Sequence, residues 1–209
     1  MILFDHYPKA GGTTVRRWLL KCFDDHEVFN LNDRAQSKSR LAFMNNPRRL
    51  DFKCLLAHSG FELIKYMPPG TEAITVIREP IERIISWYRY SAKTPGMPGH
   101  KFAQDHDIIE YAEEFKLGDA MSNYFGSLER MESRYSVIGT VQNLGQFMVA
   151  CGVRYKLKGW QPETSNESTH PLEVTDEQIA KLRMMARGDI RIWKQFTRKH
   201  GALYVDRQA

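Results

Sequence analysis

The residues with the clearest chemical potential form the run Pro8-Lys9-Ala10-Gly11-Gly12-Thr13-Thr14, between an apolar strand-like segment and a helical one. Glycines let backbone N–H groups approach an anion, a helix start adds partial positive charge, and threonine hydroxyls add donors. Lys9 would bring a full charge to the same anion. Lys9 precedes the glycines, whereas the nucleotide-hydrolase loop G-x-x-x-x-G-K-[ST] places lysine after them. The run therefore predicts an anion-binding loop, with a plain strand-to-helix turn as the alternative.

Two further strand-like runs end in polar or cationic side chains. The run "FKCLLAH" (52–58) ends at His58, and "EAITVIR" (72–78) ends at Arg78. Ser86 stands two helical turns beyond Arg78, on a helix that Pro80 suits as a first-turn residue. Ligands of parallel α/β sheets bind beyond the carboxyl ends of the strands. We therefore expect these strand ends, together with the Lys9 loop, to line the ligand site.

The pair of runs "PKAGGTT" and "REPIERIIS" resembles the two signatures of sulfotransferases that use 3′-phosphoadenosine 5′-phosphosulfate (PAPS). Within that family it is similar to the carbohydrate branch, which includes the heparan sulfate 2-O- and 6-O-sulfotransferases. The resemblance covers residues 1–91 well and the remainder loosely. It implies a grip on two anions of one co-substrate. The residues implied for the 5′-phosphosulfate are Lys9, Gly11, Gly12, Thr13 and Thr14, and those for the 3′-phosphate are Arg78 and Ser86.

Sulfuryl transfer to a hydroxyl needs an in-line acceptor, a base for its proton and a cation near the departing phosphate. Lys9 suits the cation. His58 suits the base, because an imidazole with a pKa near ~6.5 can accept a proton at neutral pH. Related glycan sulfotransferases carry a histidine base in a similar "GH" position, although Ala57 replaces the glycine here. The alternatives are a structural role for His58, with His6 or a glutamate (Glu62 or Glu79) as base.

The alternation of short apolar runs with amphipathic helices predicts the fold that positions these residues. We expect α/β, as a P-loop-type three-layer fold with a central, mainly parallel sheet and helices on both faces. Residues 1–209 are expected to form a single sulfotransferase domain. The expected strands are 2–4, 52–58, 72–78 and 135–140.

The expected helices are defined by capping signals and apolar stripes. The first is capped by Thr13 or Thr14, and a later helix covers 144–150. One long C-terminal helix opens with a capping box of Thr175 and Gln178. The segment 30–51 is expected to be a helix or loop facing solvent or ligand, and the loops are 92–102 and 158–171. The resemblance also marks Ser165, Asn166 and Ser168 as candidate co-substrate contacts, with a simple polar loop as the alternative.

Composition excludes several function classes. The net charge of +5 over 209 residues favours an anionic ligand without indicating a nucleic-acid binder. The three cysteines lack any C-x-x-C spacing, so we expect neither a disulfide framework nor a zinc site, and no other metal requirement. No run approaches the ~18 apolar residues of a membrane segment. We expect a cytoplasmic, bacterial enzyme, unless an N-terminal anchor was removed.

The acceptor is expected to be a hydroxyl on a glycan or a small molecule, and its identity and the oligomeric state stay open. Basic residues at 34, 38, 40, 48 and 49 suit an acidic glycan or a solvated face. Two rival functions remain. One is a P-loop kinase or nucleotide hydrolase using ATP, which the lysine position and the lack of a clear magnesium element oppose. The other is a non-catalytic module that binds a phosphorylated ligand.

Overall fold

The structure is a computed structural model, and it describes residues 1–31, 52–58, 60–157 and 173–206. The chain forms two compact units, each assembled from separate stretches of sequence. The first comprises Met1–Ile77, Met131–Asn166 and His200–Ala209, and the second comprises Arg78–Arg130 and Glu167–Lys199. Among the described residues, none of the helices combines the length and apolar character that crossing a membrane requires.

The first unit is built on one sheet, which in the described residues has six strands in the order β2-β3-β1-β4-β5-β6. The first five strands pair in parallel, and β6 pairs antiparallel with β5. The expected mainly parallel sheet is therefore confirmed, while β2 and β6 were not anticipated. The strands are β1 (Ile2–Asp5), β2 (Val28–Asn30), β3 (Cys54–Ala57), β4 (Glu72–Ile77), β5 (Val137–Thr140) and β6 (Leu203–Val205).

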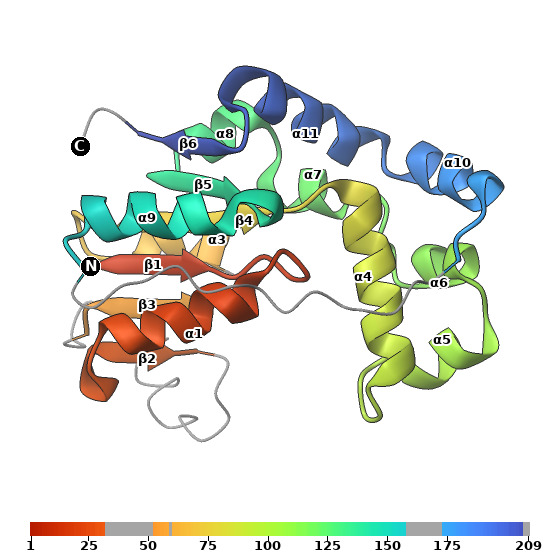
Figure 1. Ribbon diagram of the computed structural model, residues 1–209, viewed down its shortest axis with the longest axis horizontal. Coiled ribbons are helices and arrows are strands. Elements are labelled where there is room, and N and C mark those ends of the chain that lie inside the picture. Colours follow the sequence, from red (N-terminus) through yellow and green to blue (C-terminus); the bar gives the residue numbers. More distant parts are fainter. Residues whose placement is uncertain (32–51, 59, 158–172, 207–209) are drawn as a thin grey trace. The chain divides into compact units, whose positions relative to one another are not determined.

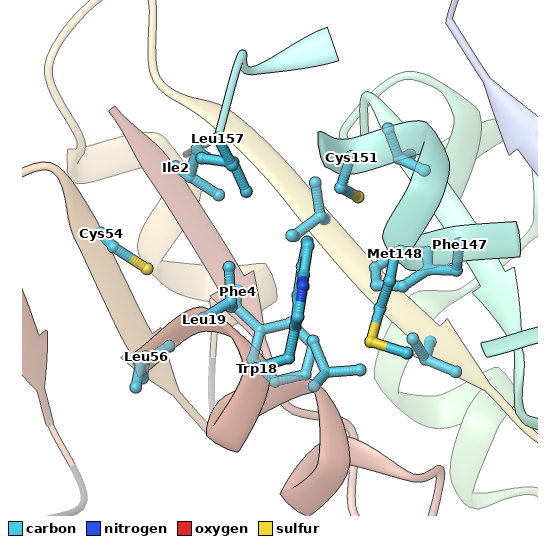
Figure 2. Close-up of a cluster of buried hydrophobic side chains, with 14 of the residues drawn as sticks. Ile2, Phe4, Trp18, Leu19, Cys54, Leu56, Phe147, Met148, Cys151 and Leu157 are labelled. Carbon is cyan, nitrogen blue, oxygen red and sulfur yellow. The ribbon is translucent and has the colours of Figure 1, made fainter. Parts of the chain in front are cut away.

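Helices cover both faces of this sheet, as expected (Figure 1). On one face, α1 (Gly12–Cys22) and α9 (Leu144–Arg154) bury apolar side chains against alternate strand residues. Figure 2 shows Trp18 of α1 and Met148 of α9 in this core beside Phe4. The short α3 (Gly60–Leu63) packs on the other face, where its Phe61 ring lies 6.0 Å from the ring of Tyr135. Three 3-10 turns complete the unit: η1 (Asp25–Glu27), η4 (Ile64–Tyr66) and η5 (Val141–Asn143).

The second unit is helical in its described part. Its core surrounds Tyr111, which is fully buried and donates its hydroxyl to Ser91 Oγ at 2.6 Å. The expected loop 92–102 is only partly a loop, because α4 continues to Lys93 and the next helix starts at His100. The helices are α4 (Pro80–Lys93), α5 (His100–Asp105), α6 (Ile108–Glu114), α7 (Ala120–Phe125), α10 (Asp176–Met185) and α11 (Arg187–His200). The sequence of α8 (Leu128–Glu132) includes Arg130, the last residue of this stretch of the second unit, and Met131, which belongs to the first.

The expected single C-terminal helix is two helices. The capping box of Thr175 and Gln178 opens α10 as predicted, but the helix ends at Met185, and its C-cap Ala186 has φ of −103° and ψ of 30°. A carboxylate from a distant part of the sequence explains the break. Asp119 Oδ1 accepts hydrogen bonds from the N–H groups of Gly188 and Asp189 at the start of α11. Asp189 in turn accepts from two N–H groups at the start of α7, so the two helix starts are capped reciprocally.

Candidate functional site

The carboxyl ends of β1, β3 and β4 lie side by side in the sheet. Asp5, the last residue of β1, pairs with Ala57 at the end of β3 and with Thr75 near the end of β4. The backbone N–H of His6 extends the ladder by donating to the Ala57 carbonyl at 2.8 Å. The Lys9 loop and His58 therefore leave the sheet from neighbouring strands at the same edge, where parallel α/β proteins bind ligands.

Lys9 occupies a strained backbone conformation. The Ala10 N–H approaches the Tyr7 carbonyl at 3.4 Å, which closes a turn with Pro8 and Lys9 at its centre. Lys9 has φ of 63°, in the left-handed region that glycine favours at the third position of such turns. A non-glycine residue there costs roughly 1–2 kcal/mol, and such strain concentrates at functional sites. A glycine at position 9 would remove this backbone strain, yet the chain has a lysine there.

The first helix begins without a side-chain cap among the described residues. Its N-cap is Gly11, with φ of 73°, and its first turn contains no acidic residue. The expected capping by Thr13 or Thr14 was wrong, because the left-handed Gly11 starts the helix earlier and places both threonines inside α1. Thr13 is exposed and Thr14 half-buried. A helix start with N–H groups that no side chain caps is suited to an anion.

Gly12 is required by its contact with His6. A Cβ atom at Gly12 would lie 1.8 Å from Cδ2 and 2.1 Å from Nε2 of His6, and its three nearest atoms all belong to that ring. Any larger residue would displace the imidazole. The glycine thus serves close packing against a histidine in addition to the approach of an anion.

His6 is a neutral imidazole at physiological pH. Burial, with the charges of His58, Arg16 and Lys9, lowers the pKa of His6 to about 3. Its ring stacks on Phe4 with a centroid distance of 5.7 Å and lies 4.1 Å from the ring of His58. A histidine with so low a pKa is a weak base, so the environment of His6 disfavours it as the group that accepts the substrate proton.

His58 has a defined orientation. Its Nδ1 lies 2.9 Å from the backbone carbonyl oxygen of His6. Since a carbonyl only accepts hydrogen bonds, this contact requires a proton on Nδ1, so the lone pair of the neutral ring is on Nε2. The residue is exposed and directly follows β3. The arrangement fixes Nδ1 as a donor and leaves Nε2 as the ring nitrogen that can accept a proton at the edge of the sheet, as a general base requires.

Asp5 anchors the turn that carries His58, although the sequence did not single it out. The carboxylate is fully buried, accepts the Gly60 N–H at 3.0 Å through Oδ1 and accepts the Tyr135 hydroxyl through Oδ2. A Cβ at Gly60 would lie 2.6 Å from the Asp5 Cβ, so glycine is needed there too. The signal that could have revealed Asp5 is an acid at the end of an otherwise apolar strand.

In the second unit, Arg78 precedes α4 and Ser86 lies in the second turn of that helix. Arg78 directly follows β4, and its Nε lies 3.4 Å from Glu82 Oε2. Glu79 caps the helix by accepting the Glu82 N–H at 2.8 Å. Burial, opposed by this hydrogen bond, raises the pKa of Glu79. Glu82 and Ser86 are spaced by four within α4, so Ser86 lies on the same side of the helix as Glu82, the partner of Arg78.

Arg83 is structural. The sequence left open whether it is a solvated charge or a structural part of the second motif. The residue is 2% exposed, and its Nη2 donates to the Leu117 carbonyl at 2.8 Å. Buried Arg83 therefore joins α4 to the segment before α7 within the second unit.

Other predicted contacts are placed as follows. The polar segment 30–51 lies outside the described residues, apart from Asn30 and Leu31, as do Ser165, Asn166 and Ser168. Among the described residues, one group, Asp24, His26 and Glu27, has ligand atoms within 4.8 Å of one another. The capping box of η1 already explains the proximity of its two carboxylates. The three cysteines are free.

Sequence similarity to a known protein covers part of the chain. No protein-family model matches the chain. A protein-tyrosine sulfotransferase of Arabidopsis thaliana is 32% identical over 95 residues, which make up 44% of this chain and 18% of that relative. The chain thus spans less than a fifth of that relative's length. The crystal structure of mouse sulfotransferase SULT7A1 complexed with PAP aligns at 13% identity and a TM-score of 0.40, covering 88% of this chain and 62% of that one, and at this score the likeness carries no argument.

Proposed function

We propose that the chain is a PAPS-dependent sulfotransferase that moves the sulfuryl group to an acceptor hydroxyl with His58 as base. The proposal rests on the residues that follow the carboxyl ends of two neighbouring strands in the first unit. An uncapped helix start with a strained lysine follows β1, and a histidine with its Nε2 lone pair presented follows the neighbouring β3. The 95-residue similarity to a sulfotransferase supports the same reaction class.

Each group has one role in the proposed reaction. Backbone N–H groups at Gly12 and Thr13, with the threonine hydroxyls, hold the 5′-phosphosulfate at the start of α1. Arg78 and Ser86 hold the 3′-phosphate. The acceptor oxygen attacks sulfur while the bond from sulfur to the bridging phosphate oxygen breaks, and the acceptor proton passes to His58 Nε2. Lys9 neutralises the charge that develops on the departing phosphate.

Two acceptor classes are proposed in order. The first is a carbohydrate hydroxyl, because the paired runs "PKAGGTT" and "REPIERIIS" resemble the signatures of the carbohydrate branch. The second is the phenolic hydroxyl of a tyrosine, because the matched relative is a protein-tyrosine sulfotransferase. Both acceptors deliver one O–H proton to the base, so the assignment of His58 does not depend on which is correct.

A transfer assay with sulfur-labelled PAPS tests the proposal over a panel of glycans, small alcohols and tyrosine peptides. We expect label on at least one hydroxyl acceptor and loss of transfer in His58→Ala, with affinity for adenosine 3′,5′-bisphosphate nearly unchanged. His26, an exposed histidine in η1, supplies the matched control, and His26→Ala should keep full turnover. Full activity in His58→Ala would move the base elsewhere, and transfer of phosphate from ATP with magnesium would replace the proposal by the kinase alternative.

A further inference from the structure

His6 contacts both the anion-binding loop and the candidate base with one ring. The Cδ2–Nε2 edge of the ring packs on Gly12 so closely that no Cβ fits between them. The centroid of the same ring lies 4.1 Å from that of His58, at an interplanar angle of 31°. The backbone carbonyl of His6 also receives the Nδ1 proton of His58.

We propose that His6 is a positioning residue, whose ring couples the anion-binding loop to His58 and holds the His58 imidazole with Nε2 presented to the acceptor hydroxyl. The inference rests on the proposed function and deepens it. It makes the loop and the base one packed unit: Gly12, the ring of His6, then the ring of His58. Phe4 stacks on His6 with an interplanar angle of 17° and restricts the ring. Phe4 thereby holds the His6 ring in the position in which it contacts Gly12 and His58.

The surroundings of His6 argue against its acting as the base itself. The charged groups that face it are Lys9, Arg16 and, when protonated, His58, and all three oppose a proton on its ring. Its Nε2 edge is packed against Gly12. Because the His6 ring resists protonation and its Nε2 edge is covered, its role is to pack against its neighbours. His6 thus differs from His58 in role, although the two rings touch.

The contact also explains why residue 12 is a glycine. Gly12 lies within α1, where alanine is the better helix former. The nearest atoms that an added Cβ would meet are all in His6. Removing the His6 ring should therefore make alanine acceptable at residue 12. The effect of alanine at residue 12 should therefore depend on the His6 ring, and this dependence can be measured without a ligand.

A thermal-unfolding cycle tests the contact with Gly12→Ala, His6→Ala and the double variant. We expect Gly12→Ala to lower Tm in the wild-type chain and to leave Tm equal or higher in the His6→Ala background. A Gly12→Ala loss of the same size in both backgrounds would overturn the proposal. Gly145, near the start of α9, has open space around its Cβ position and supplies the control, since Gly145→Ala should give the same shift in both backgrounds.

Kinetics with His6→Ala and His6→Gln test the positioning role. Glutamine keeps a planar group of similar length and has no basicity near neutral pH. We expect kcat to fall roughly 10–100-fold in His6→Ala, as for a misplaced catalytic group, and less than tenfold in His6→Gln. The acidic limb of the pH profile of kcat/KM should persist in both variants, because neither removes the proposed base.

Two results would contradict the proposal in these experiments. One is a His6→Gln enzyme as inactive as His6→Ala with its acidic limb gone, which would make His6 the base. The other is unchanged turnover in both variants. Failure of the sulfotransferase assignment itself would be seen separately, as no sulfate transfer by the wild-type chain, while the unfolding cycle would still measure the contact between His6 and Gly12.

Discussion

Replacing Lys9 by glycine and by alanine separates the strain at this position from its charge. Lys9 has φ of 63°, and a side chain in this region costs roughly 1–2 kcal/mol relative to glycine. Glycine loses roughly 0.5–1 kcal/mol more conformational entropy on folding. The midpoints of these ranges leave about 0.75 kcal/mol in favour of Lys9→Gly over Lys9→Ala, which corresponds to about 1.5–3 °C in Tm for a chain of this size.

Both variants lack the lysine charge, so both should lose the same contribution to anion binding. A charge-assisted hydrogen bond contributes roughly 1.5–3 kcal/mol, so its loss should weaken binding of adenosine 3′,5′-bisphosphate by about ten- to a hundredfold. Differential scanning calorimetry measures the stability and titration calorimetry the affinity. We therefore expect Lys9→Gly to be the more stable variant, and both variants to be similarly weak binders.

Lys156 offers a matched control in the same unit. It is exposed, has φ of 51° and follows α9. Lys156→Gly should raise stability relative to Lys156→Ala by a similar amount and leave the affinity unchanged. Equal stability of the two Lys9 variants would refute the strain, and unchanged affinity in both would refute the contact between Lys9 and the anion.

Three further outcomes are expected. Arg78→Ala should weaken binding of adenosine 3′,5′-bisphosphate about tenfold or more but leave adenosine 5′-monophosphate binding unchanged, whereas equal losses for both ligands would remove Arg78 from the 3′-phosphate. Because the pKa of His6 is about 3 in the folded chain and ~6.5 when unfolded, the unfolded chain takes up the proton first as pH falls, and stability is lost between those values. The His6 titration should lower the free energy of unfolding, measured with urea, by about 2 kcal/mol between pH 7 and pH 5. His6→Gln should show a smaller loss over this range, and an equal loss in both proteins would contradict the low pKa of His6. Asp5→Ala leaves the Gly60 N–H and the Tyr135 hydroxyl without their acceptor and should destabilise by about 2–4 kcal/mol, against about 1 kcal/mol for Tyr135→Phe; equal costs would argue against the buried carboxylate as anchor.

The parts of the fold that local chemistry determines could be predicted from the sequence. Pro80 opens α4, the box of Thr175 and Gln178 opens α10, and the buried parallel strands are recognisable as short apolar runs. The three-residue strands β2 and β6 are too short for a periodic pattern, so they were missed. The cap of α1 was assigned to a threonine because the left-handed conformation of Gly11 is not visible in the residue types.

The features that depend on distant residues could not be predicted. The break between α10 and α11 is explained by Asp119, which is 69 positions from Gly188 in the chain. The orientation of His58 depends on the His6 carbonyl, 52 positions away. The sequence predicted His58 as a candidate base and His6 as its substitute, and only the packed rings with Gly12 distinguish their environments. Tertiary contacts, more than residue types, therefore decide the proposed roles within this site.

Titration calorimetry of the wild-type chain with adenosine 3′,5′-bisphosphate, and separately with ATP and magnesium, tests the central claim most directly. The proposed grip on a 5′-phosphate and a 3′-phosphate predicts micromolar or tighter binding of the bisphosphate without metal, and much weaker binding of ATP. A strong preference for ATP with magnesium, or no measurable binding of the bisphosphate, would contradict the assignment of the chain as a PAPS-dependent sulfotransferase.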